Sequence, residues 1–193
     1  MEPPLHVVRD ADVAPSPWRN GGGVTRELLA WPPGAWIVRV SVAEIDADGP
    51  FSAFPGVERW FAVLDGDGVE LAHDGGAPVR LGTLDPIHRF RGDEATHCRL
   101  AGGRTRDFNL MVRRDAATAT VTTLPAGHAA TSDWAGCFAA TPVRVRVAGE
   151  AAWQALPARA LAWTTAPARL EIDAAPGARG WRIDIVLGTA VRR

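Results

Sequence analysis

The sequence contains no lysine, so all 21 of its basic residues are arginines. This absence excludes a lysine Schiff base and a lysine general base. A GC-rich codon bias explains the pattern across the whole chain, because Ala, Gly and Pro are abundant as well. Arginine still matters for recognition, since its planar guanidinium matches a carboxylate through two parallel hydrogen bonds.

Cysteine is scarce, and the two present, Cys98 and Cys137, lie far apart in the sequence. Neither belongs to a disulfide framework or a zinc-binding pattern, so we expect two reduced, buried thiols. No apolar run approaches the length of a membrane span. The residues Met1–Pro4 lack the basic region and apolar run of a signal peptide, which predicts a cytoplasmic protein with no membrane partner.

Motifs for metal binding and nucleophilic catalysis are also lacking. The five histidines form no HxH, HxxxH or HExxH pattern, and no GxSxG is present. We therefore expect no metal and no cofactor. The net charge of −1 offers no basic excess for phosphate contacts, so a nucleic-acid partner is not expected.

Short apolar runs separated by glycine and proline turns fill the 193 residues, and no long stretch has a helical period. The clearest predicted strands cover Trp36–Ala43, Arg59–Leu64 and Asp107–Arg113. The strand at Arg59 leads into the turn Asp65–Gly68 and returns as a hairpin. This texture predicts an all-β chain built as a sandwich or a barrel.

Polar residues recur at alternate positions of these strands. Arg39 and Ser41 share one face, and Asp107, Asn109 and Met111 share another. Two interpretations remain open: the polar faces meet solvent, as in most antiparallel sheets, or they line a barrel that holds a ligand.

Three consecutive glycines, Gly21–Gly23, stand out near the start of the chain. Glycine loses the most backbone freedom on folding, so such a run suggests a sharp turn or a close approach. The stretch is neither a P-loop nor GxGxxG, which makes a nucleotide loop a poor interpretation. Arg26 and Glu27 follow the run, and on a regular strand only one of them can face a pocket.

A barrel interior lined by these polar strand residues would suit a small carboxylate, paired with either Arg39 or Arg59. Backbone N–H groups of the glycine loop would add to it, and Trp60 would extend the apolar lining. The candidate ligand-binding residues are Asn20, Thr25, Arg26, Arg39, Ser41, Ser52, Phe54, Arg59, Asp107, Asn109 and Met111. Alternatively, single arginines form surface salt bridges to neighbouring carboxylates such as Glu27, Glu44 or Glu58.

Four segments of the first 114 residues resemble the HutD/Ves family and occur in the family's order: Pro17–Glu27, Arg39–Ala43, Asp48–Arg59 and Asp107–Arg114. The resemblance implies a bicupin, with two jelly-roll (RmlC-like) β-barrels in one chain. We expect residues 1–114 to form the barrel with the pocket and residues 115–193 to form a second, scaffold-like barrel.

The resemblance also implies a function. HutD-like members are thought to modulate histidine utilisation, which suggests a formylglutamate- or urocanate-like ligand, whereas Ves-like members are tied to stress responses. Pro55, Val57 and Arg59 stand where cupins carry metal-binding imidazoles, so we interpret the chain as a metal-free cupin.

Three hypotheses remain open: a module that binds a small carboxylate, an isomerase or hydrolase acting on a small organic acid, and a protein that binds only a macromolecular partner. Glu27 or Asp107 would be the general acid or base of the enzyme. Such a role needs a perturbed carboxyl group, which sequence does not reveal. A homodimer is left open.

Overall fold

The computed structural model describes residues 5–125, 132–165, 169–189 and 191. Within these ranges the chain forms strands, with one 3-10 turn, Asp10–Asp12, and no α-helix. None of the described residues belongs to a helix long and apolar enough to cross a bilayer. Backbone contacts divide the chain into two units, residues 13–115 and residues 1–12 together with 116–193.

The first unit, residues 13–115, consists of two antiparallel sheets. The larger sheet contains, in spatial order, β2 (Ser16–Pro17), β3 (Gly23–Trp31), β4 (Val38–Ile45), β11 (Thr105–Arg113), β6 (Val57–Asp65) and β9 (His88–Arg91). The smaller contains β5 (Gly49–Pro50), β10 (Thr96–Leu100), β7 (Val69–His73) and β8 (Val79–Leu81). Ile45, Phe61 and Val63 of the larger sheet join Leu71 and Cys98 of the smaller in one apolar core. The two sheets therefore enclose an interior, which we call the N-terminal barrel.

The second unit has the same two-sheet plan. Its larger sheet contains β1 (His6–Arg9), β16 (Ala160–Thr165), β13 (Trp134–Ala139), β18 (Gly180–Leu187) and β12 (Ala117–Thr123). Its smaller sheet contains β15 (Gln154–Leu156), β14 (Val143–Val147) and β17 (Leu170–Asp173). Its core is rich in small residues, including Ala135, Cys137 and Ala162.

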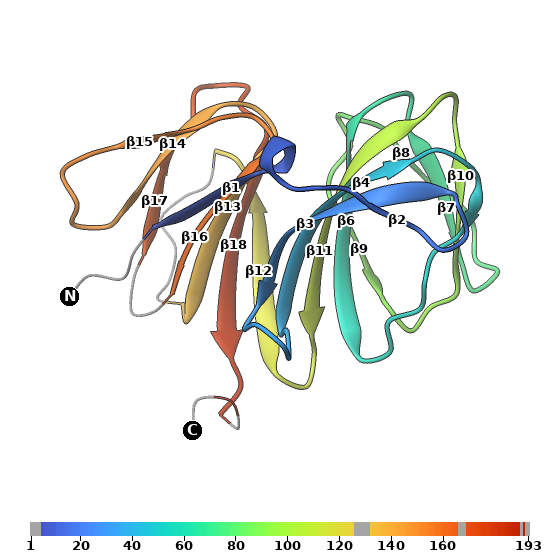
Figure 1. Ribbon diagram of the computed structural model, residues 1–193, viewed down its shortest axis with the longest axis horizontal. Coiled ribbons are helices and arrows are strands. Elements are labelled where there is room, and N and C mark those ends of the chain that lie inside the picture. The colour runs from blue at the N-terminus through green and yellow to red at the C-terminus, as the bar shows by residue number, and fades with distance from the viewer. Residues whose placement is uncertain (1–4, 126–131, 166–168, 190, 192–193) are drawn as a thin grey trace. The chain divides into compact units, whose positions relative to one another are not determined.

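The division expected from sequence, at residues 114 and 115, did not anticipate the position of β1. His6–Arg9 pairs with β16, so the start of the chain belongs to the second unit. Figure 1 shows this pairing as a blue strand beside an orange one. A strand of four residues carries no local signal of its partner, because pairing joins residues distant in the sequence.

Three neighbouring strands, β4, β11 and β6, determine which side chains face the interior of the N-terminal barrel. The cross-strand partners are Arg39, Met111 and Arg59 on one rung, Ser41, Asn109 and Phe61 on the next, and Ala43, Asp107 and Val63 on the third. Because Phe61 and Val63 belong to the interior core, their rung partners also face inward. The polar positions noted in the sequence therefore face the interior and not the outer surface of the sheet.

The two cysteines are buried free thiols. Burial raises the pKa of Cys98 and of Cys137 to about 12. Both are therefore protonated at neutral pH, and the prediction of two reduced, buried thiols is confirmed.

Candidate functional site: a polar cluster inside the N-terminal barrel

Arg59 is the centre of the candidate site. It is only 4% exposed, and three aromatic rings surround its guanidinium carbon, those of Phe51 at 5.3 Å, Phe54 at 5.6 Å and Phe90 at 4.8 Å. Its Nη1 donates a long hydrogen bond of 3.5 Å to the carbonyl oxygen of Ser52, and its buried Nε has no partner in the described part of the chain. Aromatic faces attract a cation, but they do not neutralise it.

Arg39 lies on the same rung and differs in having a counter-ion. Its Nε donates to Glu27 Oε2 at 2.6 Å, and its Nη1 lies 3.7 Å from Met111 Sδ. Burial, and secondarily the charge of Arg39, lower the pKa of Arg59 to about 10, so Arg59 remains a cation at neutral pH. Glu27 pairs with Arg39, and its side chain is 47% exposed. The cluster consequently reaches solvent at Glu27.

Asn109 and Asp107 extend the cluster along β11. The side-chain oxygen Oδ1 of each is buried and has no hydrogen-bond partner among the described residues. Asp107 Oδ2 accepts a hydrogen bond of 2.8 Å from the Thr105 hydroxyl. Burial raises the pKa of Asp107 to about 8, although that hydrogen bond acts in the opposite direction. Asp107 is therefore largely a neutral acid at pH 7.

A histidine pair, which the sequence did not suggest, packs against Phe90, one of the rings around Arg59. His73 Nε2 and His88 Nε2 are 3.0 Å apart, and both rings pack against Phe90, with centroid distances of 4.8 and 5.6 Å. The two histidines come from different sheets and are separated by 15 positions, so no local spacing could have revealed them. Among the described residues, no group of three or more His, Cys, Asp or Glu side chains is placed to hold one metal ion.

Two residues expected in the site lie on the other face of the larger sheet. Arg26 is paired with Val42, and its Nη1 lies 2.5 Å from Glu44 Oε1, which corrects the expectation that it lines the site. Glu27 faces the interior instead, in agreement with the rule that only one of the two can. Trp60 likewise alternates away from Arg59 and contacts the guanidinium of Arg89 at 5.4 Å.

Asn20 lies outside the cluster, which corrects a second expectation. Its exposed side chain accepts a hydrogen bond of 3.1 Å from the Gly22 amide and so stabilises the glycine loop. The loop leads into Gly23, which pairs with Ile45, six residues along β4 from Arg39 and thus about 20 Å from the Arg59 rung. A Cβ on Gly23 would lie 2.2 Å from the Glu44 carbonyl oxygen, so the close approach of two strands requires glycine there.

Thr25 lies in β3, whereas Ser52 lies in the segment between β5 and β6, outside both sheets. Thr25 is on the rung of Asp107, and its Oγ1 accepts a hydrogen bond of 2.7 Å from Trp18 Nε1. Ser52 is exposed and contributes its backbone carbonyl to Arg59. Of the expected ligand-binding residues, the structure brings together Arg39, Ser41, Phe54, Arg59, Asp107, Asn109 and Met111.

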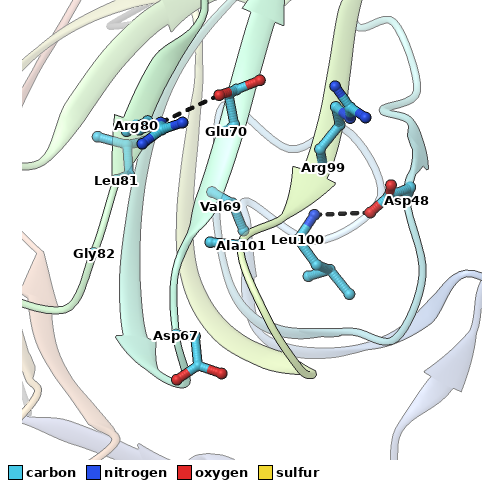
Figure 2. A pocket seen from close by; sticks show the side chains of 10 residues that line it. All are labelled: Asp48, Asp67, Val69, Glu70, Arg80, Leu81, Gly82, Arg99, Leu100 and Ala101. Carbon is cyan, nitrogen blue, oxygen red and sulfur yellow. Dashed lines mark hydrogen bonds and ion pairs between the residues drawn. The ribbon is translucent and has the colours of Figure 1, made fainter.

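A separate hollow of about 460 Å³ lies where β7 begins and where β8 and β10 end (Figure 2). Most of its charged groups already have partners: Arg80 Nε lies 3.3 Å from Glu70 Oε2, and Asp48 Oδ1 accepts from the Leu100 amide at 2.8 Å. Because internal bonds occupy these groups, the hollow is a weaker candidate for recognition than the buried, unpaired Arg59.

The two-sheet plan of each unit defines the class of protein: a bicupin, with two jelly-roll barrels in one chain. A cupin 2 conserved barrel domain protein from Leptotrichia buccalis has this fold at 10% identity, with a TM-score of 0.59 over 95% of this chain and 96% of the other. The profile of the HutD family matches residues 10–180. The chain therefore belongs to the HutD family.

Solved structures of similar proteins cover nearly the whole chain. A conserved protein of unknown function from Pseudomonas aeruginosa PAO1 is 26% identical, with a TM-score of 0.84 over 95% of this chain and 99% of that one. HutD from Pseudomonas fluorescens SBW25 is 27% identical, with a TM-score of 0.80 over 96% and 100%. The bicupin fold extends over both units.

Curated relatives match over a shorter region. An uncharacterised 21.2 kDa protein in the hutC 3′ region of Pseudomonas putida is 38% identical over 117 residues, which is 55% of this chain and 57% of that protein. Protein Ves of Citrobacter koseri is 39% identical over 109 residues, 54% and 56% of the two chains. The chain thus matches little more than half the length of these relatives.

Proposed function

We propose that the N-terminal barrel binds a small carboxylate and that Arg59 pairs with it. The observation that carries this proposal is the buried guanidinium of Arg59, which has no carboxylate partner in the described part of the chain. A buried charge without a partner costs several kcal/mol. An anion bound beside Arg59 would remove that cost and receive a charge-assisted, two-pronged contact.

The surroundings of Arg59 favour it over Arg39 as the primary contact. Arg39 already donates to Glu27, whereas Arg59 is held only by aromatic rings and one long bond to a carbonyl. The rings exclude water and thereby strengthen a charge pair. Asn109 and Ser41, on the next rung, then offer hydrogen bonds to the rest of the ligand.

The comparisons support a link to histidine utilisation. The profile match is to HutD, and the P. putida relative is described by its position near hutC. On this basis we infer a cytoplasmic module that modulates the pathway by holding a formylglutamate- or urocanate-like acid. The structure of HutD from P. fluorescens is described as a formate condition, which makes formate a natural first probe.

A second candidate function rests on Asp107. A buried carboxyl group with a pKa of about 8 keeps its proton at neutral pH and can act as a general acid. An isomerase or hydrolase acting on a small organic acid would use it in this way. Mass spectrometry of the candidate acids after incubation with the protein tests this alternative, and product that disappears in Asp107→Asn would support it.

The binding proposal is tested by thermal shift with Arg59→Met. The wild-type melting temperature should rise with millimolar formate, formylglutamate or urocanate, whereas Arg59→Met should fold without responding to any of them. Arg80→Met is the matched control, because Arg80 is exposed and lies at the far end of the smaller sheet. An unchanged response in Arg59→Met, or no response of the wild type to any carboxylate, would overturn the proposal.

A further inference from the structure

We propose that the anion binds together with one proton, which the His73–His88 pair accepts, and that the site therefore favours small dianionic carboxylates over monoanionic ones. This inference rests on the proposed carboxylate site. It gives a role to the histidine pair, which the function described so far does not use.

Hydrogen-bond directions determine where the pair carries its protons. The Thr96 hydroxyl donates to the Glu94 carbonyl oxygen at 3.1 Å, so Thr96 Oγ1 must accept from His73 Nδ1, 2.9 Å away. In the neutral pair His73 Nε2 is then bare and accepts the Nε2–H of His88 at 3.0 Å. This series of hydrogen bonds leaves His88 Nδ1 without a proton, so His88 Nδ1 is the atom that accepts an incoming proton.

The charges that face the pair come from three directions. Arg59 of β6 lies beyond the shared Phe90 ring and lowers the pKa of His73, while Glu94 and Asp74 raise it. Glu94 also raises the pKa of His88, which the neighbouring His73 lowers. Burial is the largest influence on both histidines and lowers the pKa of each below the ordinary value of 6.5. Without an anion the pair is therefore neutral at pH 7.

An anion beside Arg59 changes this balance. It offsets the repulsion from the guanidinium and adds an attraction to an imidazolium, so the pKa of the pair must rise on binding. Between the pKa of the free protein and that of the complex, binding takes up a proton. In that interval affinity increases as pH falls, by at most about tenfold per pH unit for one full proton.

The preference for a dianion follows from the charge count. Arg39 is already matched by Glu27, so the protonated site offers two further cations: Arg59, which has no carboxylate, and the imidazolium, which is only partly compensated by Glu94, whose Oε2 lies 3.8 Å from His73 Nδ1. A monoanion neutralises one of them and leaves the other buried. A small dianion neutralises both, and its advantage therefore grows as the pH is lowered.

Fumarate and crotonate make a matched pair of probes, because a methyl group replaces one carboxylate on the same rigid skeleton. Isothermal titration calorimetry from about pH 5.5 to about pH 8, in Bis-Tris and in imidazole, measures affinity and proton uptake together, since the heat depends on the buffer when protons move. For wild-type protein we expect proton uptake with fumarate. We also expect a fumarate affinity that rises several-fold per pH unit toward acid, and a fumarate-to-crotonate ratio that rises with it.

His88→Gln and His73→Gln should each bind fumarate at about pH 8 and lose most of the pH dependence and the proton uptake. His97→Gln is the control, since this histidine is exposed on the smaller sheet. Heats of binding that do not depend on the buffer in the wild type would overturn the proton linkage. The same pH dependence of affinity in His88→Gln, His73→Gln and His97→Gln would overturn it as well. Crotonate binding as tightly as fumarate at acid pH would overturn the dianion preference. Failure of formate, fumarate and crotonate alike would instead overturn the carboxylate site itself.

Discussion

Each unit buries an arginine inside its barrel, and the two arginines are satisfied differently. Arg182 in the second unit is 5% exposed, donates from Nε to Asp184 Oδ2 at 3.1 Å and from Nη2 to the Leu170 carbonyl oxygen at 2.5 Å. Arg59 in the first unit is 4% exposed and has no carboxylate within the described residues. The second unit compensates the charge of Arg182 internally, whereas the first leaves Arg59 without a carboxylate among the described residues.

The buried carboxyl groups of the two units show the same contrast. Burial raises the pKa of Asp184, but Arg182 and the Ser132 hydroxyl both counteract it. Asp107 has only the Thr105 hydroxyl to counteract burial, and its pKa reaches about 8. The contrast concerns these charged groups, because neutral polar atoms without a partner also occur in the second unit, such as Trp134 Nε1 and Thr164 Oγ1.

The largest expected effect is a divergence between Arg182→Met and Arg59→Met. Removing Arg182 leaves the partly buried Asp184 without its cation, which should lower the free energy of unfolding by about 3 kcal/mol. Removing Arg59 deletes an uncompensated charge, so that variant should keep or gain stability. Urea denaturation followed by tryptophan fluorescence measures both. Equal losses in the two variants would show that both arginines are structural.

Asp107→Asn should stabilise the protein in a pH-dependent way. The folded-state pKa of about 8 exceeds the ordinary value of 3.8, so between these values the unfolded chain is ionised and the folded chain still holds the proton. Wild-type stability therefore falls as pH rises through this window, and the gain from asparagine should grow from nothing near pH 4 to a few kcal/mol at pH 8.

The measurement for Asp107→Asn is urea denaturation at several pH values, with Asp115→Asn as an exposed control. Asparagine keeps an acceptor for the Thr105 hydroxyl, so the substitution changes the ionisation and little else. A gain that is the same at acid and alkaline pH would contradict a neutral Asp107.

The smallest expected effect concerns Glu27→Gln. This change removes the carboxylate that Arg39 uses and leaves a second cation available to an anion. We expect formate affinity to increase about two- to fivefold, with stability changed by less than about 0.5 kcal/mol, because the pair is partly exposed. Calorimetry with Glu70→Gln as the control checks it, and weaker binding would mean that Glu27 itself contacts the ligand.

Much of the candidate site could be predicted because strand periodicity is local. Alternation placed Arg39 with Ser41 and Asp107 with Asn109 on common faces, and the structure places all four in one interior. What alternation could not predict was the partner of each charge. Arg26 pairs with Glu44 on the other face, an outcome that depends on where the neighbouring strand places its carboxylate.

The sequence by itself determined an all-β chain and the faces of its long strands, and its glycine run indicated a sharp turn or a close approach. Hydrophobic period, turn residues and the size of a side chain act over a few residues, so they can be recognised without a structure. The tertiary structure decided that β1 joins the second unit, that His73 meets His88, and that Arg59 rather than Arg39 lacks a counter-ion. These features depend on burial and on distances between residues far apart in the chain, and the energy of a charge depends on both.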